Sequence, residues 1–216
     1  ERLPGGTVSS SLVLVGDNRT TPPIDPRALA QAAGVADQVE WREYVADPDL
    51  DGDLAQATAA ELGGLGLQCD VADAEAVTAA VATTERHYGR LDILFSNAGF
   101  GAATLDLDDA LSARDATWQR MWDVHVMAHV RACRAALPGM LERGSGCLVN
   151  VASAAGLLSQ TGDTPYSATK HAAVGLAESL AITYGDRGIQ VSVICPQYVA
   201  TAIIGADEGT APGSMP

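Results

Sequence analysis

The sequence predicts an α/β protein built on a doubly wound parallel sheet with helices on both faces. Two observations support this prediction. Short apolar runs of the kind found in buried strands alternate along the chain with longer segments of helical periodicity, and this alternation is typical of parallel sheets covered on both faces. The chain has 216 residues, of which 47% are hydrophobic and 19% charged, so it can bury the core of one such domain.

Strands are expected where the apolar runs occur, because strands of a parallel sheet are covered on both faces. The runs lie at residues 12–15, 43–46, 67–71, 91–96, 147–151 and 190–195. In a doubly wound sheet, ligands bind beyond the carboxyl ends of the strands, where the strand order reverses. Candidate site residues at these ends are Asp47, Asp70, Asn97, Ser153 and Pro196.

Helices are expected between the strands, at residues 26–33, 53–62, 74–88, 113–137 and 166–184. The fourth is apolar around much of its circumference, which is typical of a helix buried on two sides. Its apolar residues are Trp118, Met121, Trp122, Val126, Met127 and Val130. The fifth carries small residues at helical spacing, which permit close approach by another helix. These are Ala168, Ala172, Gly175 and Ser179. Packing against the chain's own sheet explains one face of each helix but hardly both.

The chain contains one lysine, Lys170, against twelve arginines, and this lysine follows Tyr166 by four residues. Residues at this spacing share one face of a helix, so the ammonium can lie close to the phenol. A neighbouring cation favours the phenolate and lowers the tyrosine pKa from about 10 toward neutrality, where the hydroxyl can give or take a proton. A solvated lysine on a surface helix is the alternative.

Two strand ends carry further candidates. Ser153 follows the apolar run at 147–151, where its hydroxyl can hydrogen-bond a substrate oxygen or simply cap the next helix. The run at 91–96 leads directly into Asn97, Ala98 and Gly99. A glycine at such an exit lets the backbone approach a flat ligand.

With these elements in this order, residues 45–201 closely resemble the short-chain dehydrogenase/reductase family. The resemblance implies a single-domain Rossmann-like fold and hydride transfer between a nicotinamide cofactor and a carbonyl or secondary alcohol. It implies that Tyr166 acts as acid or base and that Ser153 orients the substrate oxygen. Lys170 would lower the tyrosine pKa and hold the nicotinamide ribose. The two helices at 113–137 and 166–184 match the family's dimer interface, so we expect a homodimer or homotetramer.

The resemblance also implies the cofactor contacts. Asp47 would accept hydrogen bonds from a ribose diol and repel a 2′-phosphate, so NAD is favoured over NADP. An ordinary loop aspartate is the alternative, because Asp49, Asp51 and Asp53 follow it closely. The other cofactor-binding residues are Gly16, Asp70, Val71, Asn97, Ala98, Gly99, Tyr166, Lys170, Pro196, Val199 and Thr201.

Three departures from the family pattern affect these expectations. His125 stands where the family has an asparagine that relays protons to the tyrosine and lysine, and histidine can still donate and accept. Gln197 replaces the glycine after Pro196. Of the glycine-rich turn that binds pyrophosphate, only Gly16 remains, so we expect weak cofactor binding. A catalytically impaired relative that serves as a dimer partner or scaffold is therefore the competing function.

We expect one domain over residues 1–216, with residues 1–44 atypical in sequence and residues 202–216 a short, flexible tail. The family normally adds a substrate lid, a helix and a strand after Thr201, and without them the substrate is not identifiable. A chain without an initiator methionine fits a fragment. A truncated natural product and a faulty reading frame are the other readings.

Charge and composition exclude several classes of partner. The formal net charge of −14 argues against nucleic acid and anionic membranes, which require clustered basic side chains. No apolar run approaches the length of a membrane span, and no secretory signal is visible. The cysteines Cys69, Cys133, Cys147 and Cys195 show no C-x-x-C spacing, which favours reduced thiols in a cytoplasmic protein. His125 and His129 lack nearby ligands that would complete a metal site.

Overall fold

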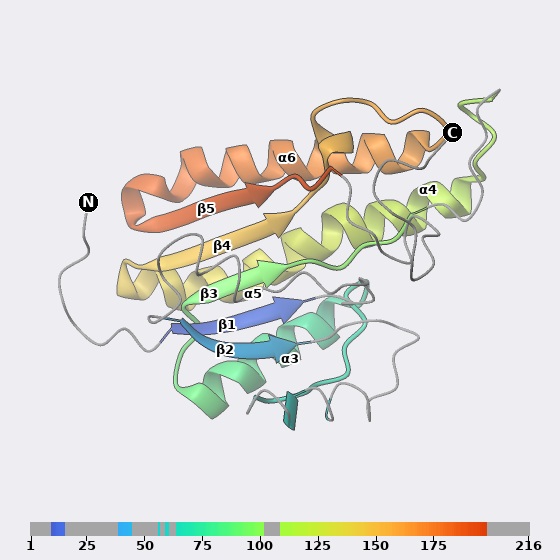
Figure 1. Ribbon diagram of the computed structural model, residues 1–216. Coiled ribbons are helices and arrows are strands. Elements are labelled where there is room, and N and C mark those ends of the chain that lie inside the picture. The colour runs from blue at the N-terminus through green and yellow to red at the C-terminus, as the bar shows by residue number, and fades with distance from the viewer. Residues whose placement is uncertain are drawn as a thin grey trace.

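The computed structural model describes residues 10–15, 39–44, 56, 59–60, 64–101 and 109–197. Within these residues, five parallel strands form one sheet in the order β2-β1-β3-β4-β5 (Figure 1). Their bounds are β1 Ser10–Val15, β2 Val39–Tyr44, β3 Ile93–Ser96, β4 Gly146–Val151 and β5 Ile189–Ile194. The strand order reverses beside β1, which lies between β2 and β3. This arrangement confirms the predicted doubly wound parallel sheet.

Two expected strands were wrong in position or type. The strand expected at residues 43–46 lies earlier, at β2, where it pairs with β1 along its whole length. The run at 67–71 has no regular secondary structure. Cys69 and Val71 are buried in the main core, and the Asp70 carboxylate accepts a hydrogen bond of 2.8 Å from the Ala72 N–H. Packing of alternate side chains on the core therefore produced the apolar pattern without strand pairing.

Helix α3 spans Ala74–Tyr88, the bounds expected from the sequence. The Asp73 side chain caps its start by accepting hydrogen bonds from the N–H groups of Glu75 and Ala76. The helix ends at Gly89, whose φ of 85° is a left-handed conformation that glycine adopts at little cost. Local sequence signals thus define both ends of this helix.

The helix expected at residues 113–137 consists of three parts. Helix α4 (Asp115–Trp122) continues into a π-helical turn (Asp123–Met127), and α5 (Ala128–Arg143) follows. Helix α5 runs past Pro138, which is exposed, so water can reach the carbonyl whose helical hydrogen bond the proline removes. The π-helical turn places His125 inside the protein, at 0% exposure. Such turns occur frequently at functional sites.

Helix α6 spans Thr164–Tyr184, close to the range expected. The helix expected at 26–33 lies outside the described residues. Of the helix expected at 53–62, only residues 56, 59 and 60 are described, and all three are helical.

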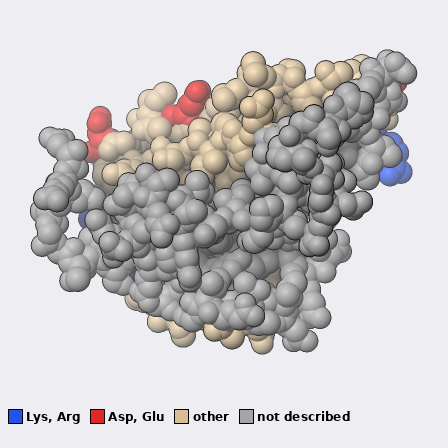
Figure 2. Space-filling view, in the orientation of Figure 1, with Lys and Arg blue, Asp and Glu red and all other residues tan. Residues whose placement is uncertain are grey.

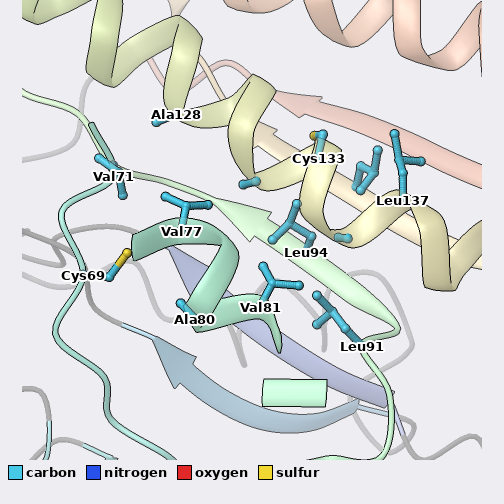
Figure 3. Packing of buried hydrophobic residues seen from close by; sticks show 14 of the residues in the cluster. Cys69, Val71, Val77, Ala80, Val81, Leu91, Leu94, Ala128, Cys133 and Leu137 are labelled. Carbon is cyan, nitrogen blue, oxygen red and sulfur yellow. The ribbon is translucent and has the colours of Figure 1, made fainter. Parts of the chain in front are cut away.

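The main core lies between the sheet and helices α3 and α5 (Figure 3). Val77 and Val81 of α3 pack there with Leu94 of β3 and Cys133 of α5. Side chains alternate between the two faces of each strand. On the opposite face, Phe95 and Val151 are also buried. Both faces of the sheet are therefore covered, as the apolar strands predicted.

The register of the sheet positions the site. Parallel pairing aligns Ser96 with Asn150 and Val151 with Ile194, so the carboxyl ends of β3, β4 and β5 lie at one edge. Beyond the strands, the Ala154 N–H donates to the Pro196 carbonyl at 2.8 Å. The segments that follow these strands are thereby held side by side.

The four cysteines are free. Cys69 and Cys133 are buried, whereas Cys147 and Cys195 are half-buried. Burial raises the pKa of the Cys133 thiol to about 12, so this group stays protonated at neutral pH. Among the helices that the structure describes, none is both long and apolar enough to cross a membrane.

Candidate active site

The start of α6 places the tyrosine and the lysine. The Asp163 carboxylate accepts a hydrogen bond of 3.1 Å from the Tyr166 N–H, and Pro165 lies in the first turn. Both features favour a helix start at this point. Tyr166 and Lys170 consequently lie one turn apart on the same side of α6.

Lys170 is an interior residue, with 3% of its surface exposed. Its Nζ lies 5.5 Å from the centroid of the Tyr166 ring and donates to the Val151 carbonyl at 3.4 Å. The alternative of a solvated surface lysine is therefore wrong, because α6 packs this side chain against the end of β4.

Gly156 permits this close packing. A Cβ built on Gly156 would lie 2.6 Å from the carbonyl oxygen of Lys170, and a backbone atom cannot move aside without shifting α6. Gly156 belongs to the short 3-10 turn Ala154–Gly156 that follows Ser153. The absent side chain at this position thus sets the distance between the serine segment and the lysine turn.

We expect Gly156→Ala to lower the free energy of unfolding by about 1–3 kcal/mol, because it overpacks a site bounded by backbone. Urea denaturation monitored by circular dichroism measures this change. Gly185→Ala is the matched control, since a Cβ there meets no atom within 4 Å. Equal stability of the two variants would contradict the close packing.

Ser153 performs the capping role that the sequence allowed, and its hydrogen bond to a substrate oxygen stays a prediction. Its Oγ accepts a hydrogen bond of 3.2 Å from the Ala155 N–H and so caps the following turn. The same side chain is hydrogen-bonded to the Tyr166 hydroxyl. The two hydroxyl groups can therefore converge on one substrate oxygen.

The expected direction of the tyrosine pKa was wrong. Burial raises the pKa of Tyr166 above its ordinary value of 10.0, and the nearby Asp163 carboxylate adds to this rise, whereas the hydrogen bond with Ser153 opposes it. The Lys170 ammonium, 5.5 Å from the centroid of the ring, does not reverse this rise. The phenol is therefore protonated at neutral pH and available as a proton donor.

Burial also lowers the pKa of Lys170 from 10.5 to about 8, although the nearby Cys195 partly opposes this change. Within the described residues, the Val151 carbonyl is the one hydrogen-bond acceptor of the ammonium. An ammonium has three N–H donors, so two remain for a ligand. This group fits the hydroxyls of a cofactor ribose.

The exit of β3 approaches this ammonium. A Cβ on Gly99 would lie 3.3 Å from the Lys170 Nζ and 3.6 Å from the His125 ring, so glycine leaves the space above both groups open. Ala98 is buried and Asn97 half-buried at the same exit. The backbone of residues 97–99 and the lysine together fit a flat cofactor.

His125 joins two parts of the site through both ring nitrogens. Its Nε2 accepts a hydrogen bond of 3.1 Å from the Phe100 N–H, and its Nδ1 lies 2.9 Å from the Thr169 Oγ1. The ring packs edge-on against Tyr166, with centroids 5.5 Å apart. Burial lowers the pKa of His125 well below 6.5, and the charges of Lys170 and His129 lower it further.

The structure brings together one group of the predicted site residues: His125, Ser153, Tyr166, Lys170, Asn97, Ala98, Gly99 and Pro196. Asp70 and Val71 lie in the segment before α3, where the Asp70 carboxylate accepts a hydrogen bond from the Ala72 N–H and Val71 is buried in the same core cluster as Ala98. Their predicted contact with adenine stays a prediction. The other predicted residues lie outside the described part of the chain: Gly16, Asp47, Val199 and Thr201.

Sequence reasoning missed Thr169 and Phe100. Thr169 lies between the two catalytic candidates in the chain and is fully buried, but a threonine in a helix gives no signal of its own. Phe100 acts through its main-chain N–H, which any residue except proline supplies. The signal that could have found them is His125 itself, because a buried histidine needs hydrogen-bond partners for its ring nitrogens.

A second buried histidine lies one turn after His125. The Nδ1–H of His129 donates to the Asn150 Oδ1 at 3.0 Å. Its Nε2 is buried and has no hydrogen-bond partner in the described part of the chain. Burial therefore lowers the pKa of His129 to about 4.

Acid should destabilise the protein through this residue. Because the unfolded chain binds the proton near pH 6.5 and the folded chain only near pH 4, the stabilisation is complete above pH 6.5 and is lost as the pH falls toward 4. The loss is about 3 kcal/mol. Urea denaturation measures the free energy of unfolding at pH 6.5 and at pH 4. Between these two pH values, His129→Gln should lose about 3 kcal/mol less of this free energy than the wild type. The same pH dependence in the variant would contradict the assignment.

The fold is a doubly wound sheet of the dinucleotide-binding class, with a tyrosine and a lysine one helical turn apart beside the carboxyl ends of its strands. The sequence profile of the family described as short chain dehydrogenase matches residues 43–210. The chain therefore belongs to the short-chain dehydrogenase family, and this membership implies a nicotinamide dinucleotide cofactor.

Individual relatives agree with this assignment. The chain is 40% identical over 163 residues to the inactive 2-(S)-hydroxypropyl-CoM dehydrogenase 2 of Xanthobacter autotrophicus, covering 73% of this chain and 67% of that protein. It is 37% identical over 164 residues to D-threitol dehydrogenase of Mycolicibacterium smegmatis, covering 74% and 62%. The crystal structure of a short-chain dehydrogenase from Streptomyces avermitilis superimposes with a TM-score of 0.71 at 29% identity, covering 87% of this chain and 65% of that one. The chain thus spans about two thirds of the lengths of these proteins.

Proposed function

We propose that the chain is an NAD(P)-dependent oxidoreductase that transfers hydride between nicotinamide and a carbonyl or secondary alcohol. The observation that carries this proposal is the buried contact of the Tyr166 hydroxyl with Ser153, with the Lys170 ammonium against the tyrosine ring. This arrangement supplies a proton and a second hydrogen bond to one substrate oxygen, which is what carbonyl reduction requires.

The bound nicotinamide supplies the hydride. Tyr166 donates its proton to the substrate oxygen during reduction and accepts it during oxidation. Ser153 donates a hydrogen bond to the same oxygen and stabilises the charge that develops there. The Lys170 ammonium would hold the ribose hydroxyls of the cofactor through its remaining N–H groups, and the absence of a side chain at Gly99 would let the nicotinamide ring approach.

Binding of NADH to the purified protein tests the proposal, measured by titration of cofactor fluorescence. The glycine-rich turn is reduced to Gly16 in the sequence, and each lost hydrogen bond to a charged phosphate costs about 1.5–3 kcal/mol. We therefore expect a dissociation constant weaker than micromolar. Tight NADH binding would show that residues 16–25 form a working substitute for the turn.

We propose NAD rather than NADP as the cofactor, because Asp47 follows the second strand in the sequence and a carboxylate there repels a 2′-phosphate. NADPH binding tighter than NADH binding would contradict this choice. Asp47→Ala should reduce the difference between the dissociation constants for NADH and NADPH.

The competing function is a catalytically impaired dimer partner or scaffold. Two observations favour it: the reduced glycine-rich turn and the word inactive in the name of one relative. Absence of NADH binding, even after a complete glycine-rich turn is grafted after Val15, would support the scaffold. Restored binding would support the oxidoreductase.

We also propose that the chain is a homo-oligomer in the cytoplasm, paired through α4, α5 and α6. Ala168, Gly175 and Ser179 of the small-residue stripe are exposed. Trp122 of α4 is 43% exposed and Ile182 of α6 is 85% exposed. The described surface visible in Figure 2 is mostly uncharged, with a few acidic and basic groups, which suits contact between copies. The four free cysteines favour a reducing compartment.

A further inference from the structure

A directional chain of hydrogen bonds runs from the loop after β3 to the first turn of α6. It begins at the main-chain N–H of Phe100, which lies 3.1 Å from the His125 Nε2. A backbone N–H can only donate, so Nε2 must be the unprotonated nitrogen of the ring. The proton of the neutral imidazole therefore resides on Nδ1.

The other half of the chain depends on Thr169. The His125 Nδ1–H donates to the Thr169 Oγ1 at 2.9 Å, and the Thr169 hydroxyl donates to the main-chain carbonyl of Tyr166 at 3.0 Å. Thr169 and His125 are both completely buried. Each group in this series of hydrogen bonds can therefore act only as the donor or only as the acceptor at each contact.

We propose that Thr169 is a positioning residue, which holds His125 in the Nδ1–H tautomer and thereby fastens the loop at residues 97–101 to the turn that carries Tyr166. This inference rests on the proposed function, because that loop and that tyrosine form the two sides of the candidate site. A hydroxyl that already donates to a helical carbonyl can only accept from the ring, so the threonine favours the same tautomer as the Phe100 N–H does from the other side of the ring.

This arrangement assigns His125 a different task from a proton relay through its ring. Both ring nitrogens are engaged, so a proton could pass only after one of the two bonds breaks. A doubly protonated ring would direct an N–H toward the Phe100 N–H, and two donors repel. Protonation of His125 therefore releases the loop, and the lowered pKa of this residue keeps the loop fastened at neutral pH.

Among the residues that the structure describes, the titratable and charged groups near this ring come from three helices. Lys170 and Tyr166 lie on α6 and His129 lies on α5. Arg120 of α4 lies over the Phe100 ring, 5.7 Å from its centroid. The charges of Lys170 and His129 oppose protonation of His125, so they add to the effect of burial.

The tautomer can be measured in the free protein. We would record long-range nitrogen–proton NMR spectra of the ¹⁵N-histidine-labelled wild type, with His125→Asn to assign the ring. The wild type and Thr169→Ser, which retains the hydroxyl, should show Nδ1 protonated. Thr169→Val, which is similar in shape but lacks the hydroxyl, leaves the Nδ1–H without an acceptor, so only the Phe100 N–H favours this tautomer and the Nε2–H population should rise. An Nε2–H tautomer in the wild type would overturn the proposal.

Hydrogen exchange of the Phe100 amide reports the fastening of the loop. We expect exchange at neutral pH to be about tenfold faster in Thr169→Val than in the wild type, and Thr169→Ser should restore protection. Unchanged exchange in Thr169→Val would overturn the proposal, and so would protection in the wild type that persists after His125 titrates. If Thr169→Val does not fold, the wild-type tautomer and Thr169→Ser still decide the question. Neither measurement uses the cofactor, so a failure of NADH binding would count against the proposed function alone.

Discussion

Replacing Tyr166 with phenylalanine should lower kcat by about a thousandfold, while the dissociation constant for NADH changes less than about twofold. The substitution removes only the hydroxyl, and general acid catalysis by one positioned group contributes a factor of about 10²–10⁴. The ring remains in place against His125 and below the lysine ammonium. Steady-state oxidation of NADH with an accepted carbonyl substrate measures kcat, and fluorescence titration measures the affinity.

Tyr184→Phe is the matched control for this experiment. Tyr184 lies at the end of the same helix, where Arg187 covers its ring at 5.5 Å, so its hydroxyl is remote from the candidate site. This variant should retain wild-type kcat. A wild-type kcat in Tyr166→Phe would show that another group donates the proton.

Replacing Lys170 with methionine should stabilise the protein and abolish cofactor binding. The pKa of Lys170 is lowered from 10.5 to about 8, which corresponds to about 3 kcal/mol of destabilisation at neutral pH. Methionine has a similar length and carries no charge, so it removes this penalty. The contacts with the Val151 carbonyl and the Tyr166 ring are lost as well, so we expect a net gain of about 2 kcal/mol.

The sign of this effect can be checked by its pH dependence. The unfolded chain holds the lysine proton up to pH 10.5, whereas the folded chain releases it near pH 8. The penalty is therefore complete below pH 8 and disappears as the pH rises toward 10.5. Urea denaturation should show the wild type approaching the stability of Lys170→Met over this interval.

Arg187→Met provides the control for the lysine substitution, because Arg187 is an exposed cation beside an aromatic ring. Its stability should match that of the wild type within about 0.5 kcal/mol. A Lys170→Met protein that is less stable than the wild type at pH 7 would show that the contacts of the ammonium outweigh its burial. Retained NADH binding in that variant would remove the lysine from the cofactor site.

The candidate site could be predicted where it depends on spacing along one helix or on strand ends. Tyr166 and Lys170 lie on one face because they are four residues apart in α6. Ser153 meets them because the carboxyl ends of parallel strands lie at one edge of the sheet. These positions follow from helical spacing and from the order of strands in the sequence, so they can be predicted without knowing which other residues pack around them.

The failures have a common physical cause. The run at residues 67–71 is apolar because Cys69 and Val71 face the core, and an apolar pattern does not distinguish strand pairing from packing. The pKa of Tyr166 depends mainly on burial of the side chain by the fold. This burial outweighs the effect of Lys170, the neighbour in sequence that was expected to lower the pKa. In both cases the deciding interaction comes from residues distant in the chain.

The sequence by itself determined the α/β class, the bounds of α3 and the serine, tyrosine and lysine of the candidate site. Helix capping and helical spacing depend on residues only a few positions apart, so they can be predicted from the sequence alone. Only the tertiary structure decided that Lys170 is buried, that Tyr166 keeps its proton and that His125 fastens one loop to α6. His125 and Thr169 are 44 residues apart, and contact over that distance depends on the packing of the whole fold.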